Sequence, residues 1–208
     1  MVFSLALASV LDVISRWDTA WFYLVNLGTQ NRFFDVIMPL LSDIKLWRIP
    51  LLVVSLAALI AGNRRVRATV LLAILALVLS DQISSQLLKP LVARQRPSHV
   101  LEGVRLLVGR GGRYGFPSSH AANVFAVWTI LAARHRRTAY YLLVIPLGVA
   151  YSRVYVGVHY PLDVLGGALL GISLALGVWM IGERVLWPLM SRTRKTPSRG
   201  DRQRKDAL

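Results

Sequence analysis

Apolar runs separated by short polar stretches dominate the sequence. Five of these runs approach the about 20 residues that a helix needs to cross the hydrocarbon core of a bilayer. Short connections between consecutive helices favour antiparallel neighbours in a compact bundle. The pattern therefore predicts an all-α fold, a polytopic transmembrane helical bundle. The five runs cover residues 47–62, 67–88, 118–133, 138–156 and 160–187.

Small residues in the last run predict close helix packing. Gly166, Gly167 and Gly171 fall within the apolar stretch that begins near residue 160. Glycines at such spacing allow the backbone of a neighbouring helix to approach closely. We expect a neighbouring helix to pack closely against this one.

The first 45 residues depart from the pattern of clean spans. Asp12, Arg16 and Asp18 interrupt one apolar stretch, and several polar residues from Asn26 to Asp35 interrupt the next. We expect amphipathic segments along the membrane interface, with aromatic side chains at headgroup level. A sixth span within residues 1–28 is the alternative. The expected aromatic anchors are Trp17, Trp21, Phe22 and Tyr23.

Composition supports a membrane protein. Of the 208 residues, 55% are hydrophobic and 17% are charged, whereas a soluble domain carries roughly a quarter charged residues. These values exclude a disordered chain and argue against a soluble monomer. The absence of cysteine excludes disulfides and thiolate metal sites. We divide the chain into an interfacial segment at residues 1–45, a transmembrane domain at residues 46–190 and a disordered tail at residues 191–208.

Basic clusters set the expected orientation. The net charge is +15, and three clusters of Lys and Arg follow the first, third and fifth runs, at residues 64–67, 134–137 and 192–205. If five spans alternate, all three lie on one side, which the positive-inside rule assigns to the cytoplasm. We read these clusters as a topology signal and expect no nucleic-acid partner. The loop at residues 90–117 then faces the periplasm of a bacterial inner membrane.

That outer loop carries more positive charge than topology favours. Glu102 is its one carboxylate. Positive charge on the disfavoured side predicts an anionic ligand. The basic residues in and just before the loop are Lys89, Arg94, Arg96, Arg105, Arg110 and Arg113.

Three short stretches at this outer end are rich in residue types that bind phosphate. They read KPLVARQRP from Lys89, FPSSH from Phe116 and SRVYVGVHYPLD from Ser152. A phosphoryl group in transfer spreads negative charge over three oxygens and needs fixed cations and N–H donors around it. The first and third stretches supply such cations, a Lys as a point charge and Arg as a planar fork.

The second and third stretches add groups that can react. Pro117 predicts a helix start, where free backbone N–H groups face an anion, and His120 falls in the first turn. If a helix begins at residue 159, His159 and Asp163 share a face. The carboxylate then holds one ring nitrogen and leaves the other as a nucleophile. A second histidine can protonate the leaving oxygen.

Each of these residues taken alone is also consistent with a structural histidine or an interfacial arginine; their joint occurrence in order favours a site. The pattern resembles the type 2 phosphatidic acid phosphatase (PAP2) family. The family signature is Lys with Arg-Pro seven residues on, then Pro-Ser-Gly-His, then Ser-Arg followed by His and, four residues later, Asp. The match covers residues 89–163 closely and the rest of the chain by hydropathy.

The resemblance implies roles for the matching residues. It implies that His159 is the nucleophile that forms a phosphohistidine, oriented by Asp163, and that His120 is the general acid and later the base for water. It implies no metal and no other cofactor, which agrees with the scarcity of carboxylates near the motifs. The residues that it implies for phosphate binding are Lys89, Arg96, Ser118, Ser119 and Arg153.

Ser119 is a departure, since the family usually has Gly there and its backbone N–H contacts phosphate. A serine in ordinary helix can offer the same N–H, because glycine is essential only for positive φ or very close approach. Asp81, about 12 Å from Lys89 along a helix, is the other unusual residue. An ionisable group at that depth is a functional candidate, although a polar packing stripe with its Ser and Gln neighbours is favoured.

A site at the outer face of a chain with little mass outside the membrane suits a lipid phosphate substrate. Within the resemblance, the small size and the stretch with Asn26, Phe34, Asp35 and Met38 are most similar to bacterial undecaprenyl-diphosphate phosphatases. Phosphatidylglycerophosphate and lipid A 1-phosphate are alternative substrates, and transfer to a lipid acceptor is an alternative reaction. A non-enzymatic lipid-binding protein is a third hypothesis, disfavoured by the intact His120, His159 and Asp163. The sequence favours no particular oligomeric state.

Overall fold

The computed structural model describes residues 2–192, with side chains from residue 9 to residue 185. Within that range the protein is helical and has no β-strand; one isolated bridge joins Gln95 and Tyr114. The predicted all-α fold is confirmed. The helices are α1 (Val2–Asn26), α2 (Arg32–Ser42), α3 (Ile44–Ala61), α4 (Arg64–Gln82), the π-helix η1 (Ile83–Leu88), α5 (Lys89–Val92), α6 (Pro97–Val100), α7 (Ser119–Arg134), α8 (Arg136–Leu142), α9 (Val144–Tyr155) and α10 (Pro161–Arg192).

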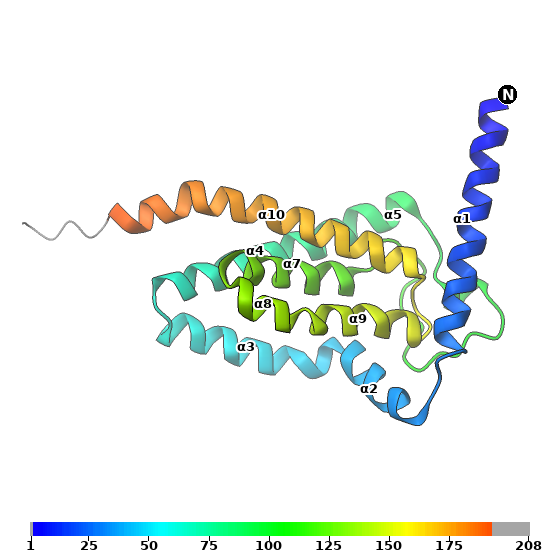
Figure 1. Ribbon diagram of the computed structural model, residues 1–208, viewed down its shortest axis with the longest axis horizontal. Helices are drawn as coiled ribbons and strands as arrows, with labels where there is room; N and C mark the ends of the chain where they lie inside the picture. Colours follow the sequence, from blue (N-terminus) through cyan, green and yellow to red (C-terminus); the bar gives the residue numbers. More distant parts are fainter. Residues whose placement is uncertain (1, 193–208) are drawn as a thin grey trace, which may run out of the picture.

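Three helical stretches are long and apolar enough to cross a membrane, namely Ile44–Ala61, Arg64–Val92 and Pro161–Val185. They correspond to three of the five predicted spans. Almost all of the α3 side chains are exposed to the surroundings of the protein, as expected for a helix that faces lipid. The helices α3, α4, α7, α9 and α10 run along the same direction in Figure 1, and the predicted transmembrane bundle is confirmed.

The other two predicted spans are helical as well, but one is not continuous. Residues 118–133 form most of α7, which has 16 residues. Residues 138–156 form parts of two helices, α8 and α9, that separate at Leu143. Pro146 explains the separation, because it lacks an N–H and its ring clashes with the carbonyl four residues earlier, at Leu142.

Helix α7 occupies the centre of the bundle and contacts α4, α8, α9 and α10. Leu72, Ala126 and Val178 belong to a buried cluster that joins α4, α7 and α10. The predicted close packing at the glycines of α10 is confirmed. A side chain at Gly167 or Gly171 would overlap backbone carbonyl oxygens of α7, and one at Gly166 would overlap the Phe116 ring.

Helix α1 is continuous over 25 residues, so its charged residues do not interrupt it. Asp12 and Arg16 form an exposed ion pair of 2.8 Å one turn apart. Figure 1 shows α1 lying across one end of the bundle rather than alongside the other helices. Helix α2 follows as a short helix capped by Asn31, whose side chain accepts a hydrogen bond from Phe34 N.

Polar residues in this N-terminal part hold the long loop between α6 and α7. Asn26 is buried; its amide nitrogen donates to the carbonyls of Arg105 and Tyr155, each at 2.8 Å. Asp35 accepts hydrogen bonds of 2.6 Å from Arg105 and from the Tyr155 hydroxyl. These two donors hold the pKa of Asp35 below its ordinary value. Asn26 and Asp35, which interrupt the apolar pattern, therefore fix the loop to α1, α2 and α9.

The connections of the bundle separate into two ends. The α3–α4 turn, the α7–α8 turn and the end of α10 lie at one end, and the loop at residues 93–118 and the α9–α10 link lie at the other (Figure 1). The three predicted basic clusters thus begin at one end.

The predicted domain boundary at residue 45 falls in the first turn of α3, and α10 continues to Arg192. The rest of the predicted tail, residues 193–208, lies outside the described residues.

Candidate active site

The three motifs meet at the end of the bundle that carries the long loop. Lys89 begins α5, Arg96 precedes α6, Ser118 and Ser119 begin α7, and Arg153 lies in the last turn of α9. His120 lies in the first turn of α7, half-buried and within electrostatic reach of Arg153, His159, Lys89 and Arg96. Every residue that the sequence predicted for the site is therefore found in one region.

His159 lies at the centre of this region and is 1% exposed. Its Nε2 lies 3.0 Å from Arg96 Nη1, and its Nδ1 lies 3.5 Å from Asp163 Oδ2. Because a guanidinium only donates hydrogen bonds, the contact with Arg96 requires an unprotonated Nε2. A neutral ring then carries its proton on Nδ1, which lies 3.5 Å from Asp163 Oδ2 without forming a hydrogen bond to it.

The ionisation of His159 follows from its surroundings. Burial lowers the pKa of His159 well below its ordinary value, and the positive charges of Arg96, Arg153 and Lys89 lower it further. The ring is therefore neutral at neutral pH. A neutral imidazole has the unprotonated nitrogen that a nucleophile requires.

The expected shared helix face of His159 and Asp163 is wrong in its detail. Helix α10 begins at Pro161, so His159 precedes the helix. Asp163 instead reaches back from the first turn, and its Oδ2 accepts a hydrogen bond of 3.0 Å from Tyr160 N. This is the backbone half of a capping box. The cap, not helical periodicity, brings the carboxylate to the histidine.

Two residues that the sequence did not assign hold Asp163 from its other side. Arg94 Nη1 donates to Asp163 Oδ1 at 2.8 Å, and Arg94 Nη2 donates to Asp18 Oδ2 at 2.6 Å. Asp18 is buried in α1 and also accepts a hydrogen bond of 2.9 Å from Leu162 N. A carboxylate in an apolar stretch was the available signal for Asp18; its distance of 76 residues from Arg94 concealed the pairing.

This pairing changes the interpretation of the basic loop. Arg94 is used by Asp18 and Asp163, and Arg105 is used by Asp35. The prediction that the excess positive charge binds an anionic ligand is therefore wrong for these two residues, which bind carboxylates of the protein itself.

Lys89 is positioned by the π-helix that precedes it. The wider turn of η1 covers residues 83–88, and Lys89 follows it directly. Lys89 Nζ donates to Ser119 Oγ. Ser85 Oγ lies 2.9 Å from the same hydroxyl. π-Helical turns inside α-helices occur frequently at functional sites. Ser119, the departure from the family pattern, thus holds the lysine.

Asp81 takes the packing role that the sequence favoured. Asn123 of α7 donates to Asp81 Oδ1 at 2.9 Å, and Ser84 Oγ donates to the Asp81 carbonyl at 3.1 Å. These contacts join α4 to α7 near the π-helix. They lie between elements of the bundle rather than among the three motifs.

Three polar atoms of the site residues are buried without a hydrogen-bond partner among the described residues, namely Ser118 Oγ, Arg153 Nε and His159 Nδ1. Arg153 Nη1 donates to Ser42 O at 3.2 Å and to Ser42 Oγ, a contact that the sequence did not predict. Buried polar groups in native proteins are almost always satisfied, so donors such as Ser118 Oγ and Arg153 Nε are suited to a bound anion.

Gly115 allows the loop to approach the site. A side chain there would lie 2.8 Å from Asp163 Oδ2 and 3.2 Å from the Arg96 side chain. Arg96 Nε also donates to the neighbouring Tyr114 carbonyl at 3.2 Å. The loop therefore closes directly over the carboxylate. In the described part of the chain, no three His, Asp or Glu side chains gather as metal ligands do.

Comparison with known proteins identifies the family. Residues 67–187, more than half of the chain, match the PAP2 superfamily. The chain belongs to the PAP2 superfamily. The predicted family and enzyme class, a membrane lipid phosphatase, are therefore confirmed.

Relatives of this PAP2 protein act on different lipids. A lipid A 4'-phosphatase from Bacteroides thetaiotaomicron is 32% identical over 180 residues, 82% of this chain and 78% of the relative. The undecaprenyl-diphosphatase BcrC of Bacillus subtilis is 29% identical over 151 residues, 71% of this chain and 74% of the relative. The crystal structure of a transmembrane PAP2 type phosphatidylglycerolphosphate phosphatase from Bacillus subtilis superposes with a TM-score of 0.69 at 26% identity, and the match covers 88% of this chain and 94% of that one.

Proposed function

We propose that this PAP2 protein hydrolyses its lipid phosphate through a phosphohistidine on His159. The observation that supports this most directly is the buried ring between Arg96, whose Nη1 lies 3.0 Å from Nε2, and Asp163, whose Oδ2 lies 3.5 Å from Nδ1. Nε2 attacks the terminal phosphorus, the P–N bond forms, and the bond from that phosphorus to the leaving oxygen breaks, which is the bridging oxygen in a lipid diphosphate and the lipid oxygen in a monophosphate. Asp163 stabilises the positive charge that develops on the ring through Nδ1–H.

His120 acts on the other side of the phosphoryl group in this proposal. It protonates the leaving oxygen and then removes a proton from the water that hydrolyses the P–N bond. Lys89, Arg96, Ser118 and Arg153 hold the phosphoryl oxygens, and Ser119 positions Lys89 while its N–H faces the anion. The unpaired Ser118 Oγ and Arg153 Nε support this assignment. The chemistry requires no metal or other cofactor.

The proposed substrate is undecaprenyl diphosphate, converted to undecaprenyl phosphate. The likeness to a named undecaprenyl-diphosphatase over 71% of this chain supports it. A lipid A phosphate is the second candidate, because the relative that is 32% identical is a lipid A 4'-phosphatase.

We also propose that the site faces the periplasm and the C-terminal tail faces the cytoplasm. The basic clusters that begin at the opposite end of the bundle support this orientation. The course of α1 across the site end of the bundle (Figure 1) supports an interfacial position for residues 1–45.

The testing experiment is phosphate release by the purified protein from a panel of lipid phosphates. The panel holds undecaprenyl diphosphate, lipid A phosphates and phosphatidylglycerophosphate, with and without EDTA and a lipid acceptor. We expect the highest kcat/KM on undecaprenyl diphosphate, unchanged by EDTA. Loss of all activity in EDTA with recovery in magnesium would contradict the mechanism, and transfer to the acceptor would replace hydrolysis by phosphotransfer.

A further inference from the structure

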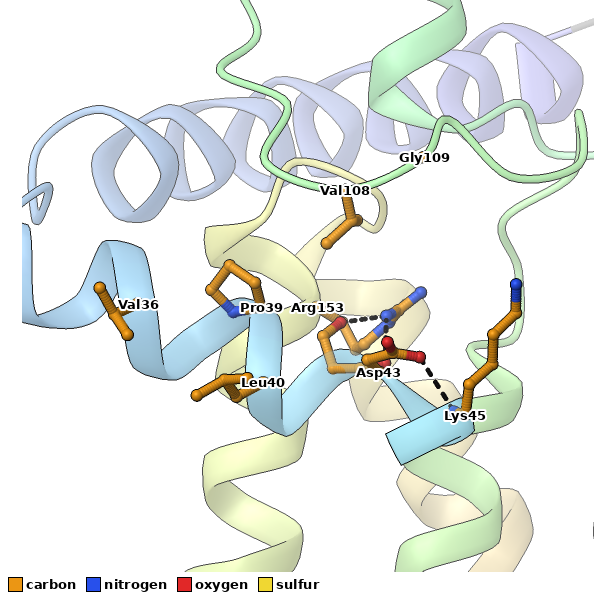
Figure 2. Close-up of a pocket in the computed structure, with 9 residues that line it drawn as sticks. Val36, Pro39, Leu40, Asp43, Lys45, Val108, Gly109 and Arg153 are labelled. Carbon is orange, nitrogen blue, oxygen red and sulfur yellow. Dashed lines mark hydrogen bonds between the residues drawn. The ribbon is translucent and has the colours of Figure 1, made fainter. Parts of the chain in front are cut away.

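A cavity of about 530 Å³ adjoins Arg153. Figure 2 shows it between the corner where α2 meets α3, the end of α9 and the loop at Val108 and Gly109. Its volume is within the roughly 300–1,000 Å³ of small-molecule sites. None of the three motifs contributes to its wall except through Arg153.

Lys45 is not paired with a carboxylate as Arg94 and Arg105 are, and it makes no ion pair among the described residues. The Lys45 side chain is exposed and reaches along the edge of the cavity (Figure 2). Arg153 lines the same space. The cavity thus has two cationic groups on its wall and one carboxylate, Asp43, which caps α3.

The corner between α2 and α3 fixes this arrangement. Asp43 Oδ1 accepts a hydrogen bond of 2.9 Å from Lys45 N and so caps α3. Ser42 anchors Arg153 through its carbonyl and its hydroxyl. A side chain at Gly109 would meet nothing within 4 Å, so the loop leaves the space open above the corner.

We propose that Lys45 forms a second phosphate subsite, which binds the non-reacting phosphate of a lipid diphosphate. The reacting phosphate lies on Arg153 and His159, and the adjacent phosphate extends into the cavity to Lys45. This subsite makes the protein selective for diphosphates over monophosphates of the same lipid. The inference rests on the proposed function and extends it to the part of the substrate beyond the reacting group.

The subsite predicts a selective effect of one substitution. Lys45→Ala removes one charge-assisted contact with the second phosphate, so kcat/KM for farnesyl diphosphate should fall roughly tenfold or more. The value for farnesyl monophosphate in the same detergent micelles should stay within about twofold, because the monophosphate does not reach Lys45. Lys45→Arg should retain most of the diphosphate activity.

Arg48→Ala is the matched control. Arg48 lies about one turn further along α3, is exposed and does not line the cavity. Its removal takes the same charge from the same helix and should leave both substrates unchanged. If Arg48→Ala lowered kcat/KM for the diphosphate as much as Lys45→Ala does, the effect would come from the overall positive charge of the surface, and the subsite would be overturned.

The remaining outcomes separate the subsite from the proposed function. Equal loss on both substrates in Lys45→Ala, or no loss on either, overturns the subsite. If Lys45→Ala does not fold, Lys45→Gln is measured by the same criterion. If the wild-type protein hydrolyses only the monophosphate, the subsite is overturned but the proposed lipid phosphatase activity stands. Wild-type protein that releases phosphate from neither lipid overturns the proposed function itself.

Discussion

At the scale of single residues, burial decides the ionisation of His159. The ring has no exposure to water that would stabilise an imidazolium, and three cations of the site oppose a further positive charge. Asp163 offsets this only in part, because its second oxygen is held by Arg94. The same contacts that prepare the lone pair of Nε2 therefore also keep the ring neutral.

This environment predicts an unusual titration. We expect the ring nitrogens of His159 to titrate with a midpoint below about 6.5, the ordinary value for histidine, since burial lowers the pKa of His159. Nitrogen NMR of the histidine rings in detergent micelles measures it, with the His159→Gln variant to assign the signal. A midpoint at or above about 6.5 would contradict a neutral nucleophile.

The sign of the linked stability follows from the same shift. Below about pH 6.5 the unfolded chain takes up a proton at His159 that the native ring does not. The free energy of unfolding should therefore decrease as the pH falls below about 6.5, because proton uptake at His159 favours the unfolded chain.

At the scale of elements, the packing of α7 against α10 depends on glycine. Gly171 faces the backbone carbonyl of Ala122, which cannot move aside as a side chain can. Gly177, six residues further along the same helix, has no atom within 4 Å of the position of a Cβ. Both glycines thus lie in the same helix, but only Gly171 has atoms close to the position of a Cβ.

Gly171→Ala should therefore destabilise the bundle, by about 1–3 kcal/mol or more from overpacking. Gly177→Ala is the control and should leave stability unchanged or raise it by about 0.5–1 kcal/mol, because alanine favours the helix. The apparent melting temperatures of both variants in one detergent provide the comparison. Equal melting temperatures would show that the two helices do not pack as described.

The elements also show what the sequence could predict. Hydrophobic periodicity located all five apolar helical regions, because burial and lipid contact both select apolar side chains. It did not locate the break at Leu143, although Pro146 marks it, or the π-helix before Lys89, which has no sequence signal of its own. The continuity of α1 was also missed, since the i,i+4 pair of Asp12 and Arg16 stabilises a helix that hydropathy alone would interrupt.

The site likewise contains residues that the sequence predicted and contacts that it did not predict. Motif spacing placed His120, His159 and Asp163, whose chemistry depends on local order in the chain. The contacts of Asp18 with Arg94 and of Ser42 with Arg153 join segments 76 and 111 residues apart. Such contacts depend on tertiary packing, and no local pattern predicts them.

At the scale of the whole molecule, the three basic clusters begin at the end of the bundle opposite the three motifs. The clusters begin after α3, after α7 and at the end of α10, and the motifs lie at the other end (Figure 1). By the positive-inside rule we propose that the motif end lies outside the cytoplasm, where a lipid carrier would present its phosphate at the outer leaflet.

Reporter fusions test this orientation. If the tail is cytoplasmic as proposed, a fluorescent protein fused after Leu208 should fluoresce, and alkaline phosphatase fused at the same position should be inactive. The control is a truncation after Gly112, in the outer loop, where alkaline phosphatase should be active. The reverse pattern would place the site in the cytoplasm and would contradict a role at the outer leaflet.

The central claim is a covalent phosphohistidine on His159, and trapping it is the most direct test. The measurement is rapid quench of purified protein with a phosphorus-labelled aryl phosphate, whose good leaving group needs little help from His120. Wild type, His120→Ala and the exposed control His135→Ala should carry label that is stable in alkali and lost in acid, and His159→Ala should carry none. Labelled His159→Ala would contradict the account.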